Sequence, residues 1–155
     1  MRLQGIKILK FKGCQDVYLD FDKNLTVIVG ANGAGKSTIL DAISVTLSWI
    51  IARLRNAKGQ GMYISDSEIY NGGSSGCIEA EFDNIQSLLI PSKSRKGISK
   101  EFSIDLRYLN QYCELLREKI EQTNQKVSLP IFVKYGVRRA VVDTALRTPY
   151  FTNIG

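Results

Sequence analysis

The sequence predicts an α/β fold with a mixed sheet, and three observations support this prediction. Residues 25–29 form a near-continuous apolar run, which is typical of a strand buried on both faces. A glycine-rich loop follows, and apolar side chains then recur at helical spacing to about Arg55. Alternating apolar and polar segments occur before and after this unit, so antiparallel strands accompany it. A chain of 155 residues is long enough for one such domain.

Two strands are predicted before the apolar run. Residues 3–11 alternate apolar and charged side chains, as in Ile6, Lys7 and Ile8, which is the pattern of a half-buried strand. Apolar side chains at every second position of residues 17–21 predict another strand. The short polar stretch between these segments favours an antiparallel hairpin.

The loop after the apolar run has the spacing of a Walker A motif over residues 30–37. Gly30 is followed by four residues and then by Gly35, Lys36 and Ser37, and both the entering strand and the leaving helix fit that motif. A glycine-rich turn that binds nothing would not need the complete pattern. The residues expected to bind a nucleotide triphosphate are Gly30, Ala31, Asn32, Gly33, Ala34, Gly35, Lys36, Ser37 and Thr38.

Each residue type in this loop has a chemical reason. Glycines can adopt positive φ, and without a Cβ they let backbone N–H groups approach phosphate closely. Lys36 can reach the β and γ phosphates and is the candidate catalytic residue, while the Ser37 hydroxyl can ligate Mg²⁺. The N-terminus of the following helix also favours an anion. Trp49 lies beside the apolar stripe of this helix and is expected to pack in the core.

The second half of the chain predicts further elements. Residues 56–75 are rich in glycine and polar residues and are interpreted as a surface loop. Residues 77–82 form an alternating strand, and residues 87–92 are its expected hairpin partner at the edge of the sheet because of Pro91. The basic residues at 93–100 fit either a solvated loop or a contact with a phosphate backbone.

A helix and a strand are predicted after this basic segment. Apolar side chains recur on one helical face between residues 103 and about 125, with Ser103 as the expected N-cap. Residues 130–135 have the composition of a buried strand, and Arg138 follows it.

Composition excludes several classes of function. The sequence has no histidine, so imidazole catalysis and histidine-containing metal sites are ruled out within it. Three cysteines without a C-x-x-C spacing indicate neither a zinc site nor a disulfide framework, which predicts a reducing, cytoplasmic setting. The longest apolar run, residues 47–52, is too short to span a bilayer. The net charge of +6 fits nucleic-acid binding, but a polyphosphate site and a solvated surface explain it equally well.

An acidic motif for hydrolysis is missing from the sequence. Such a motif has about four apolar residues followed by Asp and Glu, and the nearest match, Val141 to Asp143, has Thr144 in place of the glutamate. Two hypotheses follow: the chain is the N-terminal part of a longer ATPase, or it is a non-hydrolysing module that binds nucleotide and docks on another chain. A P-loop kinase fits poorly because antiparallel strands precede the loop.

The order of hairpin, strand and Walker A loop resembles the N-terminal half of the ABC-type ATPase heads of SMC, RecF and overcoming-lysogenization-defect proteins. The residues that carry this resemblance after the loop are Ile39, Leu40, Asp41, Ala42 and Ile43. Residues 8–13 resemble the opening of those heads, which places a basic residue, here Lys12, beside the nucleotide. Residues 128–140 are similar to bacterial AAA-type ATPases such as PtuA of the Septu anti-phage systems.

The resemblance implies that residues 1–155 are the N-terminal lobe of an ABC-type P-loop ATPase domain, with a helical insertion at about 103–125 and the second lobe absent. It implies ATP rather than GTP, Mg²⁺, and a head-to-head homodimer that encloses each ATP between two heads. DNA and a nuclease partner of the HNH type are the further partners it suggests, and no membrane. A glutamine expected after residues 130–135 is missing, and either Arg138 replaces it or that arginine is only solvated.

Overall fold

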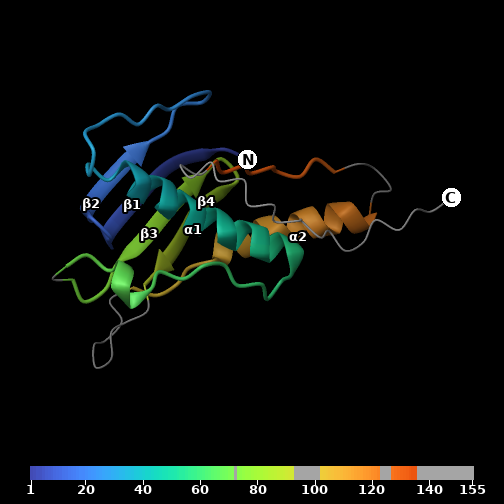
Figure 1. Ribbon diagram of the computed structural model, residues 1–155. Coiled ribbons are helices and arrows are strands. Elements are labelled where there is room, and N and C mark those ends of the chain that lie inside the picture. Colours follow the sequence, from blue (N-terminus) through green and yellow to red (C-terminus); the bar gives the residue numbers. More distant parts are fainter. Residues whose placement is uncertain (72, 93–101, 123–126, 136–155) are drawn as a thin grey trace, which may run out of the picture.

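The computed structural model describes residues 1–71, 73–92, 102–122 and 127–135, and they form one sheet with helices on one face (Figure 1). The helix α1 crosses this face, and α2 packs against α1 and β4. In chain order the elements are β1 (Leu3–Phe11), β2 (Cys14–Asp20), α1 (Lys36–Arg55), the 3₁₀ helix η1 (Asp66–Glu68), β3 (Cys77–Phe82), β4 (Ile85–Pro91) and α2 (Arg107–Gln122).

The sheet has the strand order β2-β1-β3-β4, and every neighbouring pair is antiparallel. Ile8 lies opposite Val17 on one side and Ile78 on the other, which aligns the apolar faces of three strands. Both predicted hairpins are confirmed, and β4 is an edge strand as Pro91 indicated. β2 begins at Cys14, three residues earlier than the alternation suggested, because the turn after β1 is short.

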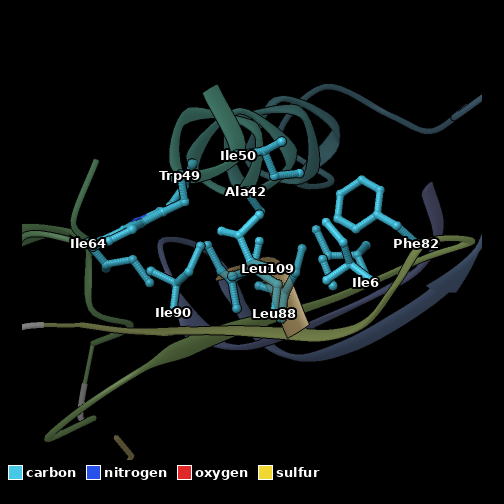
Figure 2. Close-up of a cluster of buried hydrophobic side chains, with 14 of the residues drawn as sticks. Ile6, Ala42, Trp49, Ile50, Ile64, Phe82, Leu88, Ile90 and Leu109 are labelled. Atoms are coloured by element: carbon cyan, nitrogen blue, oxygen red, sulfur yellow. The ribbon is translucent and has the colours of Figure 1, made fainter. Parts of the chain in front are cut away.

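The core lies between α1 and the sheet (Figure 2). The helix begins at Lys36 and ends at Arg55, as predicted, and its apolar stripe faces the strands. Trp49 is 1% exposed, and its indole N–H donates to the Met62 carbonyl at 2.9 Å. Its expected place in the core is therefore confirmed. Fully buried side chains that close this core include Ile6, Ile8, Phe11, Ile50, Ile64, Ile78, Leu88, Ile90 and Leu109.

The two segments that were predicted to be buried strands are not strands in this structure. Residues 25–29 and 130–135 have no regular secondary structure and lie outside the sheet. Val29 is 84% exposed and Ile131 is 88% exposed, whereas Phe132 is half-buried against the core. A strand buried on both faces needs strands beside it and layers above and below, and the described residues supply no parallel neighbours for these segments.

The prediction for the start of the second helix was also wrong. α2 begins at Arg107 rather than near Ser103, which is not its N-cap. Asp105 stays extended because it exchanges backbone hydrogen bonds with Leu89 of β4, at 3.1 and 3.2 Å. The carboxylate of Asp105 then accepts a bond from the Arg107 N–H at 3.1 Å. Pairing with the sheet edge thus delays the helix.

Residues 56–75 are more than the surface loop that was predicted. Ile64 and Ile69 are buried, and Ile69 pairs with Phe11 through an isolated antiparallel bridge. η1 lies between them, and Ser65 and Glu68 form a capping box at its start. This segment therefore covers one end of the core and reaches the turn after β1.

By length and composition alone α1 could cross a membrane, and it is the only such helix in the part of the chain that the structure describes. Its apolar face is buried against the sheet, which is typical of a core helix. The basic segment at 93–100, Arg138, and the acidic near-match from Val141 to Thr144 lie outside the described residues, so those interpretations stay predictions.

Candidate nucleotide-binding site

The loop of residues 30–35 leads directly into α1, and two of its glycines have left-handed backbone. Gly33 has φ 85° and Gly35 has φ 89°, and Gly35 is the N-cap of α1. Most side chains disfavour such angles, so glycine is required at these two positions. Gly30 has no positive φ, but a Cβ there would lie 3.3 Å from the Cβ of Ala34. Glycine is therefore favoured at position 30 because there is little space for a side chain, and not because of its backbone angles.

Lys36 folds back over this loop from the first position of α1. Its Nζ donates to the carbonyl oxygens of Gly30 at 2.7 Å and Ala31 at 2.6 Å. These bonds use two of the three ammonium donors. The ammonium group is thus held across the opening of the loop, with a donor available for an anion there.

The N-terminus of α1 offers backbone donors at the same place. Gly35 has no side chain to cap the helix, and the Gly35 carbonyl accepts the bond from the Ile39 N–H at 3.1 Å. The first N–H groups of a helix have no partner within the helix, and its dipole is positive there. Ser37 is exposed and Thr38 is half-buried in this first turn.

A magnesium ion at this loop would depend on Ser37 and on the phosphates. Within the described ranges, no group of three or more Asp, Glu, Cys or His side chains is placed to hold a metal ion. Mg²⁺ is commonly held by one or two protein oxygens together with phosphate oxygens and water. The exposed Ser37 hydroxyl fits that mode of binding, and when bound the ion would neutralise phosphate charge.

Cys14 packs against the loop from the start of β2, a contact that the sequence did not reveal. A Cβ on Gly35 would lie 3.4 Å from the Cys14 Sγ. Cys14 is buried, and burial raises the pKa of its thiol, which therefore stays neutral at pH 7. The hairpin of β1 and β2 thus supports the N-terminus of α1 with an uncharged side chain.

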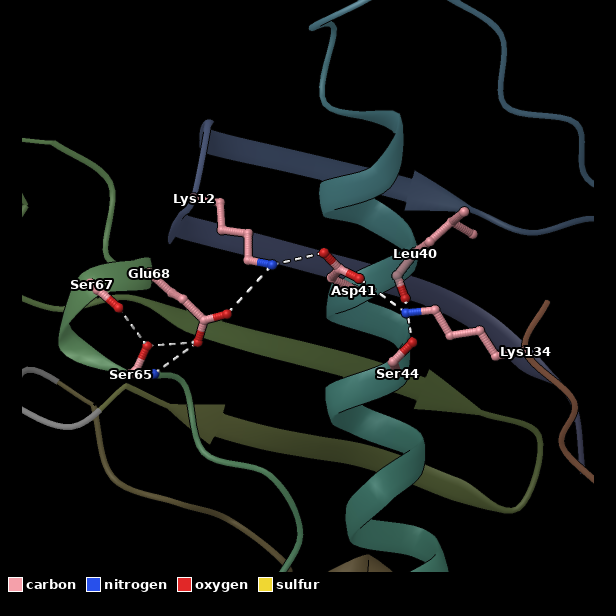
Figure 3. Close-up of polar contacts among 8 residues, drawn as sticks. All are labelled: Lys12, Leu40, Asp41, Ser44, Ser65, Ser67, Glu68 and Lys134. Atoms are coloured by element: carbon pink, nitrogen blue, oxygen red, sulfur yellow. Dashed lines mark hydrogen bonds and ion pairs between the residues drawn. The ribbon is translucent and has the colours of Figure 1, made fainter. Parts of the chain in front are cut away.

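Lys12 lies in the turn of this hairpin and points to carboxylates rather than to the loop (Figure 3). Its Nζ donates to Asp41 Oδ2 of α1 at 2.7 Å and lies 3.4 Å from Glu68 Oε1. Its backbone N–H donates to the Glu68 carbonyl at 2.6 Å, and its φ is 49°. Lys134 donates to the other oxygen of Asp41 at 3.0 Å.

These contacts shift the pKa of all three central groups toward the charged form. Burial lowers the pKa of Lys12, but the hydrogen bond and charge of Asp41 and the charge of Glu68 outweigh it, so the pKa is raised. The hydrogen bond from Lys12 lowers the pKa of Asp41, with a further contribution from Lys134. Burial opposes ionisation of Glu68, yet bonds from Ser65 and the charge of Lys12 lower its pKa. All three are therefore charged at neutral pH.

Sequence reasoning placed the loop residues together but missed the partners of Lys12. Asp41 is one of the residues after the loop that carry the resemblance to ABC-type ATPase heads, but no role was predicted for it. Ser65 and Glu68 have the spacing of a capping box, which is a readable signal for an ordered turn. That signal could have indicated that residues 65–68 form a fixed element, but not that Glu68 approaches Lys12.

The fold and the loop define the class of the protein as a P-loop nucleotide-binding domain. A family described as "AAA domain" matches residues 1–151. The chain belongs to this AAA domain family.

The curated relatives carry names of ATPases. The chain is 32% identical to the Retron Vc95 probable ATPase of Vibrio cholerae serotype O1 biovar El Tor, over 91% of this chain and 29% of the relative. It is 30% identical to the Retron Ec83 probable ATPase of Escherichia coli, over 90% of this chain and 26% of the relative. The DNA double-strand break repair Rad50 ATPase of Pyrococcus abyssi is 32% identical over 70% of this chain and 11% of the relative.

The chain spans less than a third of the length of these relatives. A solved structure from work on ATP-driven dimerization and DNA stimulated activation of SMC ATPases has a TM-score of 0.44 and 28% sequence identity. The aligned region covers 59% of this chain and 61% of the solved chain. The family match supports the resemblance to ABC-type ATPase heads that was drawn from the sequence.

Proposed function

We propose that this chain is the ATP-binding lobe of an ABC-type ATPase related to Rad50 and Smc. The observation that carries the proposal is Lys36, which spans a loop with two left-handed glycines at an uncapped helix N-terminus. This arrangement presents an ammonium group and backbone N–H groups to one point, as a polyphosphate requires. The names of the relatives, all ATPases, favour ATP as the ligand.

The roles within this site follow from the chemistry of each group. Backbone N–H groups of residues 30–38 surround the phosphates, and Lys36 neutralises charge on the β and γ phosphates as the catalytic lysine. Ser37 holds Mg²⁺ through its hydroxyl. Lys12 supplies a further positive charge near the nucleotide.

The complete protein, in this proposal, adds a second lobe to residues 1–155 and hydrolyses ATP in a head-to-head homodimer. Most apolar side chains of residues 25–29 and 130–135 are exposed, which supports a second lobe, because parallel strands beside these segments would bury them. The exposed ones are Leu25, Val27, Val29, Ile131, Val133 and Tyr135. We further propose that ATP binding and hydrolysis drive DNA transactions or anti-phage defence with an HNH-type nuclease partner in the cytoplasm. The Rad50 relative, named for DNA double-strand break repair, supports the DNA transactions. The defence role and the nuclease partner rest on the resemblance of residues 128–140 to ATPases such as PtuA.

The lysine of the loop gives the test of nucleotide binding. Lys36→Ala removes the ammonium group and is expected to weaken Mg-ATP binding by about a hundredfold or more, since a charged contact to phosphate contributes roughly 3 kcal/mol. Isothermal titration of Mg-ATP measures this change. Lys119→Ala, on the exposed surface of α2, is the matched control and should leave the affinity unchanged. Full affinity in Lys36→Ala would refute the proposed site.

The exposed apolar run gives a test of the second lobe. In the isolated chain, Val29→Ser should change the free energy of unfolding by less than about 0.5 kcal/mol, because Val29 is 84% exposed. In the complete protein the same change should cost about 1.5 kcal/mol or more, because a buried strand residue is lost. Chemical denaturation of both forms measures the difference, with Lys23→Ser as the exposed control. Equal effects in the two forms would count against burial by a second lobe.

A further inference from the structure

The polar contacts around Lys12 form a compact group outside the loop of residues 30–37. This Lys12 cluster consists of Lys12, Asp41 and Glu68 (Figure 3). The three residues come from the β1–β2 turn, from α1 and from η1. Lys12 Nζ lies 2.7 Å from Asp41 Oδ2 and 3.4 Å from Glu68 Oε1. Lys12 thus pairs with two carboxylates, and Asp41 also accepts a bond from Lys134 at 3.0 Å.

The cluster lies close to the phosphate loop. Asp41 is on the same helix as Lys36, about one and a half turns further along. On the other side, Cys14, near Lys12 in the hairpin turn, contacts the site of Gly35. Lys12 is thus two residues from a side chain that contacts the loop, while its ammonium group lies against α1. The flexible stem and rotatable donors of a lysine allow this ammonium group to change partners.

The bonds that hold Lys12 are weak enough to be exchanged. The side chains of Lys12, Asp41 and Glu68 are 33%, 37% and 31% exposed. Ion pairs with this degree of exposure contribute only about 0–1 kcal/mol. A polyphosphate offers several charged oxygens at one place, and it would attract the same ammonium group more strongly than either carboxylate.

We propose that Asp41 and Glu68 are positioning residues that bind Lys12 while no nucleotide is present. When a nucleotide polyphosphate binds to the loop, the Lys12 ammonium group leaves the two carboxylates and binds the phosphates instead. This inference depends on the proposed nucleotide site and adds a regulated contact to it. The carboxylates compete with phosphate for Lys12, so they lower the affinity for nucleotide. When Lys12 leaves, Glu68 loses its cationic partner, and η1 keeps only its capping box and backbone bonds.

A double-mutant cycle on Mg-ATP binding tests this exchange. Asp41→Asn should bind Mg-ATP about three- to fivefold more tightly than the wild type, which corresponds to the loss of one exposed ion pair. Glu68→Gln should act in the same direction without touching Lys134, and glutamine keeps the acceptor that the capping box needs. In a Lys12→Met background, each carboxylate change should alter the affinity by less than about twofold.

Controls separate this inference from the proposed function. Glu114→Gln removes one negative charge from the exposed face of α2 and should leave the affinity unchanged, and thermal unfolding of each variant checks that the fold is retained. If the wild type does not bind Mg-ATP, the proposed function fails. If the wild type binds and Lys36→Ala does not, but the carboxylate changes act equally with and without Lys12, only the exchange is overturned. Weaker binding by Asp41→Asn overturns it as well.

Discussion

Gly35→Ala should weaken Mg-ATP binding by about tenfold or more. The backbone of Gly35 has φ 89°, and a left-handed conformation costs a residue with a Cβ about 1–2 kcal/mol. The new Cβ would also lie 3.4 Å from the Cys14 Sγ, a distance at the limit of tight packing. The loop would therefore shift at the point where α1 begins and where its N–H groups must meet the phosphates.

A glycine in the neighbouring hairpin provides the control for this change. A Cβ on Gly13 would meet nothing within 4 Å, and its φ is not in the left-handed region. Gly13→Ala should therefore leave both the affinity and the stability close to those of the wild type. Titration with Mg-ATP and thermal unfolding of both variants measure the comparison. Equal affinities for Gly35→Ala and the wild type would show that the left-handed geometry is not needed for binding.

Trp49→Ala should produce the largest loss of stability, about 3–5 kcal/mol. Trp49 is 1% exposed, donates its indole N–H to the Met62 carbonyl, and meets the ring of Tyr63 edge to face at 5.0 Å. Truncation leaves a cavity between α1 and residues 61–64, and it leaves the carbonyl without this donor. Urea denaturation measures the change in the free energy of unfolding.

Ile51 is the matched control on the same helix. It is 37% exposed, so Ile51→Ala should cost well under half as much as Trp49→Ala. If both variants lost a similar free energy of unfolding, the packing of Trp49 would contribute no more to stability than that of the half-exposed Ile51. Because residues 61–64 pack on this tryptophan, Trp49→Ala should also loosen the connection that leads to η1.

The parts of the fold that the sequence predicted are those with local causes. α1 has a start signal in the glycine loop and an apolar stripe that reaches Arg55, and both can be read within a short window. The hairpins follow from period-two alternation and short turns. The loop of residues 30–37 was predicted from the spacing of its glycines, lysine and serine, which can be read directly from the sequence.

The errors came from features that depend on distant partners. The apolar composition of residues 25–29 and 130–135 is typical of strands in a buried parallel sheet. Composition alone does not indicate which part of a protein supplies the neighbouring strands. Asp105 stays out of α2 because of β4, which is distant along the chain. For the same reason the Lys12 cluster was not predicted, since its three residues come from three separate elements.

The most direct measurement of the central claim is the thermal unfolding of the purified wild-type chain with increasing Mg-ATP. A ligand that binds only the folded state should raise its stability by about 2.7 kcal/mol at a hundredfold excess over the dissociation constant. We expect this rise for the wild type and its loss in Lys36→Ala, with both proteins folded in the absence of nucleotide. An unchanged unfolding temperature for the wild type at saturating Mg-ATP would contradict nucleotide binding by this chain.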